Sequence, residues 1–167
     1  MPLRLRLPFW IAVLCTLAGV AVYGLTFANI ALHPILFLLP LLFLVWILVL
    51  QQWRRVPRRN FRSEIFGDIP RGMKAAAAAL ILFAFVNFFV CLSLNDYAQP
   101  LRTAEGRSVL QKREHVIREL TAAEFAHAQA VQVRMLSGFF IGCFALAALL
   151  AETCWIKNGP AMANAKI

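Results

Sequence analysis

Histidine and acidic side chains, which could hold a metal ion or move a proton, occur together in one polar segment of the sequence. His115 and His127 lie twelve residues apart, with Glu119 and Glu124 between them. A metal site on one helix face needs histidines at positions i and i+3 or i+4, and that spacing is absent here. The pattern favours a solvated charged surface. We therefore expect no metal ion, no cofactor and no catalytic residue set.

The four cysteines, Cys15, Cys91, Cys143 and Cys154, all fall inside apolar segments. Buried cysteine behaves as a small hydrophobic residue, so we expect no structural disulfide. Their positions also exclude a four-helix quinone-linked thiol oxidase. Such an enzyme needs paired cysteines in its outer loops, because attack by a thiolate requires exposure, and the sequence contains no Cys-x-x-Cys pair.

Two polar side chains, Asn87 and Glu152, are expected within the membrane. Polar groups at that depth are costly and are functional candidates by default. The competing interpretation of Asn87 is a structural hydrogen bond between helices, and we favour it. Glu152 falls close to the inner surface, where it either extends to the interface or pairs with a cation. The candidate cations are Arg54, Arg71 and Lys74.

The elements that must position these residues are apolar helices. The 167 residues are 61% hydrophobic and 15% charged, which is too apolar for an ordinary soluble domain. A helix needs about 20 apolar residues to cross a bilayer core of about 30 Å. Four runs are long enough: residues 9–30, 34–51, 73–95 and 135–156. The sequence therefore predicts an all-α fold, a single integral membrane domain over residues 1–167 built as a bundle of four transmembrane helices.

The distribution of Lys and Arg predicts the orientation of this bundle. Of the seventeen, eleven lie on one side of the predicted membrane and six on the other. Because cytoplasmic loops carry the excess of these residues, we expect a multi-pass protein of a bacterial inner membrane with both termini in the cytoplasm. The basic excess then indicates contact with anionic lipids of the bilayer and no nucleic-acid partner. The eleven are Arg4, Arg6, Arg54, Arg55, Arg58, Arg59, Arg62, Arg71, Lys74, Lys157 and Lys166.

The predicted cytoplasmic connector, residues 52–72, carries the densest group of cations. Its apolar residues Phe61, Ile65, Phe66 and Ile69 follow an i, i+4, i+5, i+8 pattern. This pattern predicts a short helix lying in the membrane interface, and the alternative is a solvated basic loop. Five arginines of this region are expected to contact lipid phosphates: Arg54, Arg55, Arg58, Arg59 and Arg62.

The outer segment, residues 96–134, is expected to be helical and to lie in the periplasm before the fourth membrane helix. An apolar stripe predicts a helix over Arg107–Leu120. Thr121 and Glu124 then have the spacing of a capping box, which predicts the start of a second helix that runs into the fourth membrane helix. The stripe consists of Val109, Val116, Ile117 and Leu120.

Small residues predict where the membrane helices approach one another. Little hydrophobic attraction exists between helices in lipid, so small side chains that allow close backbone contact mark packing faces. Gly19 and Gly24 have this role in the first helix. Gly138 and Gly142 form a GxxxG pair in the fourth helix, and this face is expected to pack on the first helix or on a second copy of the chain.

Several short stretches carry a family resemblance when they are taken together. They are Leu-His-Pro at residues 32–34, FRSEIFGDIPRGMK at 61–74, Val-Asn-Phe at 86–88, LTxxEF at 120–125 and RMLSG at 134–138. Over residues 30–140 the chain resembles a group of bacterial four-helix inner-membrane proteins without a known activity. It departs from them at Gly72, where the group tends to have Trp, and at Phe139, where it tends to have His. The resemblance implies the same architecture and draws attention to His33, Asn87, Glu124, Arg134 and Ser137.

Functions from three classes remain open. The favoured hypothesis is a non-enzymatic accessory or interaction subunit of a membrane assembly, which binds a protein partner or forms a homo-oligomer. The first alternative is a small oligomeric transporter or channel, which needs a polar path through the membrane; Asn87 and Glu152 are the available residues. The second is a membrane enzyme that uses an outer-surface site with His33, His115 or His127 and nearby acids.

Overall fold

The computed structural model describes residues 6–54, 69–103, 106–113 and 115–164, without the side chains of residues 33–34 and 157–164. Four long helices make up most of the chain. They are α1 (Leu7–Leu25), α2 (Leu38–Trp53), α4 (Arg71–Leu94) and α5 (Ala122–Asn164). The helical spans that contain them, Leu7–Ala28, Ile35–Trp53, Arg71–Leu94 and Ala122–Ile156, are long and apolar enough to cross a membrane, which confirms the prediction of four such helices. The predicted interfacial helix lies outside the described residues, apart from its last apolar residue, Ile69.

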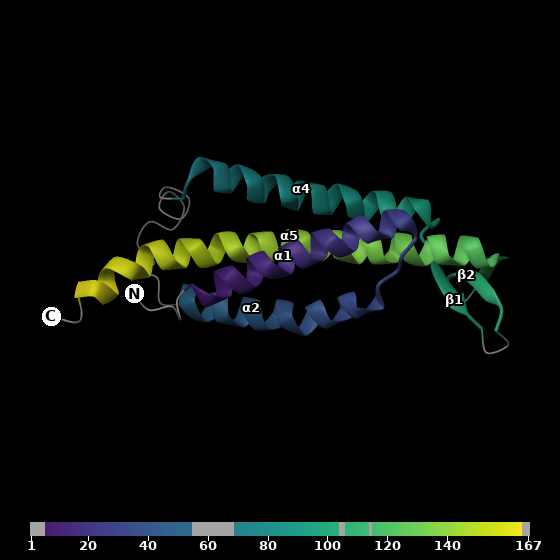
Figure 1. Cartoon of the computed structure of the whole chain (residues 1–167), viewed down its shortest axis with the longest axis horizontal. Helices are drawn as coiled ribbons and strands as arrows, with labels where there is room; N and C mark the ends of the chain where they lie inside the picture. Colours follow the sequence, from purple (N-terminus) through teal and green to yellow (C-terminus); the bar gives the residue numbers. More distant parts are fainter. Residues whose placement is uncertain (1–5, 55–68, 104–105, 114, 165–167) are drawn as a thin grey trace.

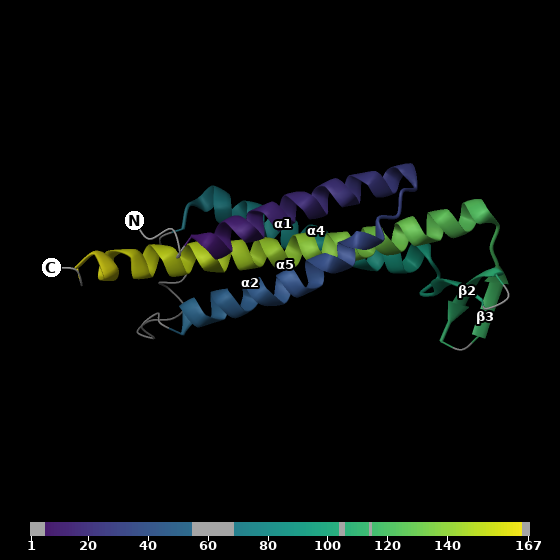
Figure 2. The same ribbon diagram turned by 60° about the horizontal axis from the view of Figure 1, so that its bottom comes forward.

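The helix α5 runs through the middle of the bundle, with α4 on one side, α2 on the opposite side and α1 crossing over it (Figures 1 and 2). In its most apolar window 61% of the residues are buried, against 22% in each of the other three helices. The buried face of α5 combines the large rings of Phe140 and Phe144 with the small side chains of Ala147 and Ala151. Alanines allow close backbone approach, and packing of this kind is a main source of attraction between helices in lipid.

The link between α1 and α2 is short and turns sharply. It contains two short 3-10 helices, η2 (Thr26–Ala28) and η3 (His33–Phe37), and Asn29 between them has a left-handed backbone with φ of 56°. Asparagine adopts this conformation more readily than most residues, because its short polar side chain can bond locally. Pro40 falls in the first turn of α2, where a missing N–H leaves no helical hydrogen bond broken.

The outer segment contains a three-stranded antiparallel sheet, so the all-α prediction is wrong in this region. Its strands are β1 (Gln99–Arg102), β2 (Ser108–Lys112) and β3 (His115–Glu119), in the order β1-β2-β3. Leu110 of β2 packs with Leu120, Phe125 and Ala128 in a small core between the sheet and the start of α5. The sheet is thereby attached to the first turns of α5 (Figure 2).

The helix predicted over residues 107–120 is replaced by β2 and β3, for a physical reason. Its apolar stripe relied on the β-branched residues Val109, Val116 and Ile117, whose stiff side chains fit strands better than helices. Two backbone positions with positive φ mark the turns: Gly106, with φ of 81°, precedes β2, and Arg113, with φ of 57°, follows it. In β2 and β3 the same apolar residues therefore belong to two paired strands.

The fourth long helix begins at Ala122 and runs without a break through the predicted membrane span, which starts at residue 135, as the capping box predicted. The predicted capping box is confirmed: the Glu124 carboxylate accepts the Thr121 backbone N–H at 2.8 Å, and the Thr121 hydroxyl oxygen accepts the Glu124 N–H at 3.3 Å. With 43 residues, α5 is about 65 Å long at ~1.5 Å per residue. Its first turns extend past the ends of the other three helices and lie beside the sheet (Figure 1).

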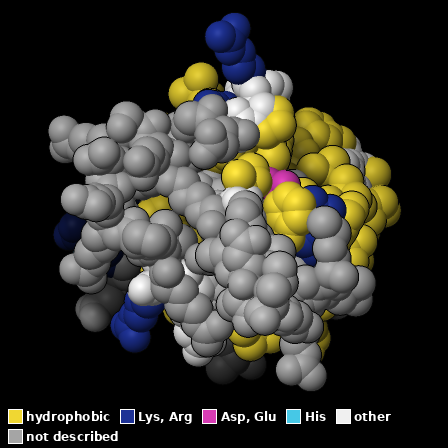
Figure 3. All heavy atoms as spheres, turned by 90° about the vertical axis from the view of Figure 1, so that its left-hand side faces the viewer, with side chains coloured by type: hydrophobic (Ala, Val, Ile, Leu, Met, Phe, Trp, Pro, Cys, Tyr) yellow, Lys and Arg dark blue, Asp and Glu magenta, His cyan; other side chains and the backbone are white. Residues whose placement is uncertain are grey.

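The two ends of the bundle differ. The start of α1, the end of α2, the start of α4 and the last turns of α5 lie at one end, which we call the inner end (Figure 1). Trp10, Trp53 and Trp155 belong to these segments. Viewed from this end, hydrophobic side chains reach the rim of the bundle and Lys and Arg side chains project at several points (Figure 3). The sheet lies at the opposite, outer end.

Candidate functional site

Asn87 lies at a junction of three helices near the outer end. Only 7% of the residue is exposed. Its Oδ1 accepts a hydrogen bond from the hydroxyl of Tyr23 in α1 at 3.2 Å, and the Cys91 thiol lies 3.5 Å from the same oxygen. Its Nδ2 donates to the backbone carbonyl of Arg134 in α5 at 3.2 Å. The amide therefore joins α4 to α1 and to α5, which is the interhelical hydrogen bonding that we favoured.

The two glycines of the GxxxG pair allow this junction to form. A Cβ at Gly138 would collide with Nδ2 of Asn87 and would lie 3.0 Å from its Cγ. A Cβ at Gly142 would lie 2.5 Å from the Cβ of Ala84. Both glycines thus face α4 in this structure, whereas we expected the first helix or a second copy of the chain.

The glycines of α1 differ from each other. A Cβ at Gly19 would lie 3.0 Å from Cγ1 of Ile141, so this glycine packs against α5. Gly24 was predicted to be a packing residue as well, but no described atom outside its own helical surroundings lies within 4 Å of the position of its Cβ.

Arg134 is a half-buried cation on α5 that faces the end of α1. Its Nε donates to the hydroxyl oxygen of Thr26 at 3.0 Å, and its Nη2 donates to the Thr26 carbonyl at 3.1 Å. The guanidinium carbon lies 4.0 Å from the centre of the Phe27 ring. Arg134 therefore binds a carbonyl at the C-terminal end of α1, where the helix dipole favours a cation. Among the described residues no carboxylate forms an ion pair with Arg134.

A second polar contact lies two turns earlier on the same helix. The Nδ1 of His127 lies 2.9 Å from Oδ1 of Asn29. An amide oxygen only accepts hydrogen bonds, so Nδ1 is the donor. The backbone N–H of Asn29 donates to the Thr26 carbonyl at 3.1 Å, the same oxygen that Arg134 binds. Arg134, Asn29 and His127 are therefore connected polar residues between α5 and the start of the link that follows α1, and we call them the outer polar arc.

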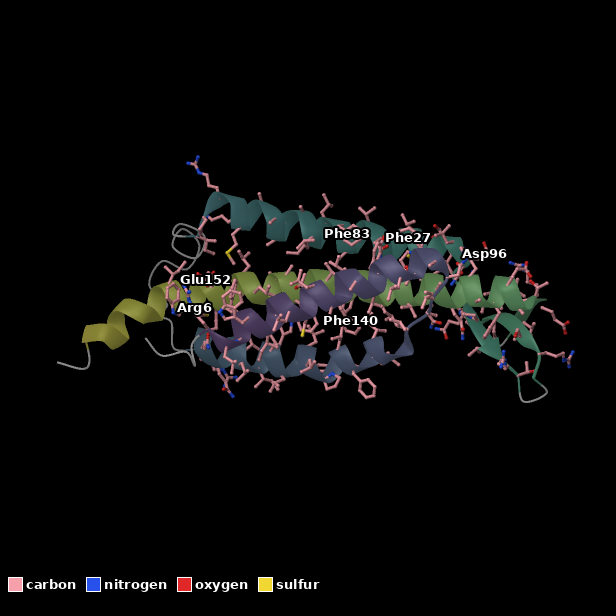
Figure 4. The ribbon with its side chains drawn as sticks, in the orientation of Figure 1. Arg6, Phe27, Phe83, Asp96, Phe140 and Glu152 are labelled. Carbon is pink, nitrogen blue, oxygen red and sulfur yellow. The ribbon has the colours of Figure 1, made fainter. Side chains whose placement is uncertain are left out.

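A pocket of about 300 Å³ lies on the other side of His127, between the end of α4, the sheet and α5. Its polar lining includes Asp96, and Figure 4 shows Asp96 at this outer end. Asp96 and the next residue, Tyr97, have positive φ values of 51° and 58°. Consecutive left-handed backbones in residues other than glycine are unusual and indicate local strain. The remaining polar lining comes from Asn95, Arg118, Glu124 and His127.

Glu124 lies at the first turn of α5, outside the predicted membrane span, and links the helix to the sheet. Arg118 of β3 donates to its carboxylate at 2.6 Å. The backbone N–H of Thr121, the Arg118 guanidinium and the Thr121 hydroxyl lower the pKa of Glu124 from 4.5 to about 2, because all three stabilise the ionised form. The ionised carboxylate therefore links Arg118 of β3 to the first turn of α5.

The histidines considered for chemistry lie on different elements. His115 is exposed on β3, and His127 is exposed on α5. The described residues contain no group of three or more His, Cys, Asp and Glu side chains placed to hold a metal ion. The four cysteines are free, and Cys15, Cys91 and Cys154 are buried.

At the inner end, Glu152 pairs with a cation that we did not consider. Its Oε1 lies 3.9 Å from Nη2 of Arg6, and the Arg6 guanidinium lies 3.6 Å from the centre of the Trp155 ring. Figure 4 shows Arg6 and Glu152 beside each other at this end. Among the described residues the partner of Glu152 is thus Arg6 and not one of the candidates Arg54, Arg71 or Lys74, and the contact joins the start of α1 to α5.

Of the five arginines expected to contact lipid phosphates, the structure describes Arg54, which is exposed at the C-terminal end of α2. Arg55, Arg58, Arg59 and Arg62 lie outside the described residues. Four residues that complete the polar contacts were missed from the sequence: Arg6, Tyr23, Thr26 and Asn29. The spacing of Tyr23 and Thr26 could have indicated their role, because they lie four and seven residues after Gly19 and therefore share its packing face on the helix.

Comparisons of the chain with protein families, with curated proteins and with solved structures find no match. Inferences about its role therefore depend on the geometry described above.

Proposed function

We propose that the protein is an integral protein of a bacterial inner membrane that acts as a non-catalytic accessory subunit of a membrane assembly. Both termini lie in the cytoplasm in this proposal, and the sheet lies on the periplasmic side. The observation that carries the proposal is the outer platform, which we define as β1, β2, β3 and the first turns of α5. The platform is an ordered surface outside the four-helix bundle, and it is firmly attached to the central helix.

The platform has features of a binding surface for another protein. All five residues of β3 are exposed, and β3 is an edge strand of the sheet. Val116 and Ile117 expose 55% and 47% of their surface. An exposed edge strand presents unpaired backbone groups, and partner proteins often bind such edges by adding a strand. The exposed apolar side chains beside the edge would become buried against the partner, and their removal from water would strengthen the contact.

The polar residues within the bundle support a structural role rather than transport. The Asn87 amide bonds to α1 and α5, and Glu152 pairs with Arg6. A transport path needs polar groups that are free to meet a solute. Within the described part of the chain, both intramembrane polar residues that we considered are engaged between helices. No observation favours the transporter or the enzyme alternative over the accessory role.

Site-specific photo-crosslinking in bacterial membranes tests this proposal. A photoreactive residue placed at Val116 on the edge strand should give a discrete adduct with one membrane or periplasmic protein. The matched control is Phe43, which is 62% exposed on α2 and should face lipid, so it should give none. Equal patterns from both positions, together with a strict monomer without a bound protein in native mass measurement, would contradict the accessory role.

A further inference from the structure

We infer that the outer polar arc, formed by Arg134, Asn29 and His127, is a binding site for a phosphate-bearing anion, supplied by the headgroup of an anionic lipid. This site lies at the end opposite Trp53 and Arg71, the residues that end α2 and begin α4, so it is separate from the predicted lipid contact of the arginines between those two helices in the sequence. The inference rests on the membrane placement proposed above and not on the accessory role.

The charge of Arg134 is only partly balanced. Its hydrogen-bond partners are the hydroxyl and the carbonyl of Thr26, both uncharged. The end of a helix contributes about half of a negative charge, so about half of the arginine charge remains. No described carboxylate pairs with it. Binding of an anion would stabilise this half-buried cation at a membrane boundary, because removing an unpaired charge from water is costly.

The hydrogen-bond donors of the outer polar arc suit a phosphate group. Arg134 uses Nε and Nη2 for Thr26, so its Nη1 is available to an outside acceptor. The Oδ1 of Asn29 is occupied by His127, which leaves the Nδ2 of Asn29 as a donor. Arg134 and Asn29 are neighbours because both donate to the same Thr26 carbonyl. A guanidinium beside an amide N–H group offers several donors to one anion, and guanidinium geometry suits phosphate oxygens.

The surroundings favour a lipid as the source of the phosphate. The apolar span that contains α1 ends at Ala28. Phe27 and Ile30 are exposed by 63% and 45%, and such apolar side chains beside a bilayer contact acyl chains. Phe27 also covers one face of the guanidinium at 4.0 Å. The cation therefore lies where apolar surface changes to polar surface, which is the depth of lipid phosphates.

The test uses the full chain in lipid nanodiscs. Phosphatidylglycerol is titrated into discs of neutral phosphatidylcholine, and bound lipid is counted by native mass spectrometry. Arg134→Gln should weaken the binding of one lipid per chain by at least about fivefold, the usual effect of one cation at a membrane surface. Asn29→Gly should weaken it in the same direction while keeping the left-handed backbone, which glycine adopts freely. Arg134→Lys keeps the charge and should bind less well because it lacks the planar fork.

Two control variants separate this site from general attraction. Lys112→Gln removes one exposed cation on the platform, and Arg54→Gln removes one at the inner end. Both variants should leave the lipid at the outer polar arc bound.

A second experiment, in which inorganic phosphate is added to neutral discs, distinguishes a lipid headgroup from a soluble anion. If phosphate alone binds in an Arg134-dependent manner, the anion site stands and its source is soluble.

The inference is overturned if folded Arg134→Gln and Asn29→Gly both bind phosphatidylglycerol as the wild type does. It is also overturned if neither phosphatidylglycerol nor phosphate binds in an Arg134-dependent manner. Should Arg134→Gln fail to fold, Asn29→Gly and Arg134→Lys carry the same test. Failure of the crosslinking experiment at Val116 would leave these results unaffected, so the two proposals fail independently.

Discussion

Gly138→Ala is the substitution that most directly tests how the bundle is held together. The added methyl group would collide with the amide of Asn87 and lie 3.0 Å from its Cγ. The collision involves a short, buried side chain between two helices, so the amide must rotate away or α4 must move out. Either response breaks the hydrogen bonds from Tyr23 and to the Arg134 carbonyl.

The expected loss of stability follows from these contacts. Each interhelical hydrogen bond in a membrane contributes about 0.6 kcal/mol, with a maximum near ~1.7 kcal/mol. Overpacking adds about 1–3 kcal/mol, and the better helix propensity of alanine returns up to about 1 kcal/mol. The net destabilisation is about 2 kcal/mol, which lowers the ratio of folded to unfolded protein by about thirtyfold.

Reversible unfolding in mixed detergent micelles, followed through the fluorescence of the four tryptophans, measures this loss. Gly24→Ala is the matched control, because no described atom outside its own helical surroundings lies within 4 Å of its Cβ position, and the stability of this variant should be unchanged or slightly higher. Asn87→Ala removes the group that collides, so the double variant should be less destabilised than the sum of the two single variants by at least about 1 kcal/mol. Additive effects, or a Gly138→Ala protein as stable as Gly24→Ala, would refute the role assigned to the Asn87 junction.

Two further predictions concern the ends of the molecule. The pKa of Glu124 is lowered from 4.5 to about 2, so its contacts stabilise the fold fully above about pH 4.5 and less as the pH falls towards 2. The difference in thermal midpoint between the wild type and Glu124→Gln should therefore shrink when the pH is lowered from 6 to 3. A difference that stays constant over this range would contradict the prediction. Replacing Arg54, Arg55, Arg58 and Arg59 with Gln should change the membrane topology or weaken binding to anionic vesicles. A reporter fused to the C-terminus and vesicle flotation measure the two effects, and the prediction fails if both stay as in the wild type.

The four long helices could be predicted because length and hydropathy alone determine whether a helix can cross a bilayer. Hydropathy does not determine which helix is central, because the interior of a helix bundle and the surrounding lipid are equally apolar. The small residues carry that information. In α1 the buried residues Ala12, Cys15 and Gly19 recur at intervals of three and four, and continuing this face by seven reaches Thr26. The partner of that face could not be predicted, because Arg134 lies more than a hundred residues away in the sequence.

The sheet was missed because short apolar runs fit either a helix or a strand. Val109 and Val116 are seven residues apart, which places them on one helix face, but the same residues fit two strands joined by a tight turn. The positive φ of Arg113 at that turn depends on the pairing of Lys112 with His115, which is not visible in residue types. Pro100 lies in β1, an edge strand of the sheet, which is where proline is tolerated in a sheet.

The contacts near the outer end form a closed ring that joins α1, α4 and α5. Tyr23 of α1 donates to Asn87 of α4, Asn87 donates to the carbonyl of Arg134 in α5, and the Arg134 side chain returns to Thr26 at the end of α1. Each link joins a different pair of helices, so loss of one link leaves the other two in place. Arg134 belongs to two links, through its backbone and its side chain. Because α5 continues beyond this ring to the sheet (Figure 1), the proposed binding of a partner at the platform would act on a helix that is linked to both α1 and α4.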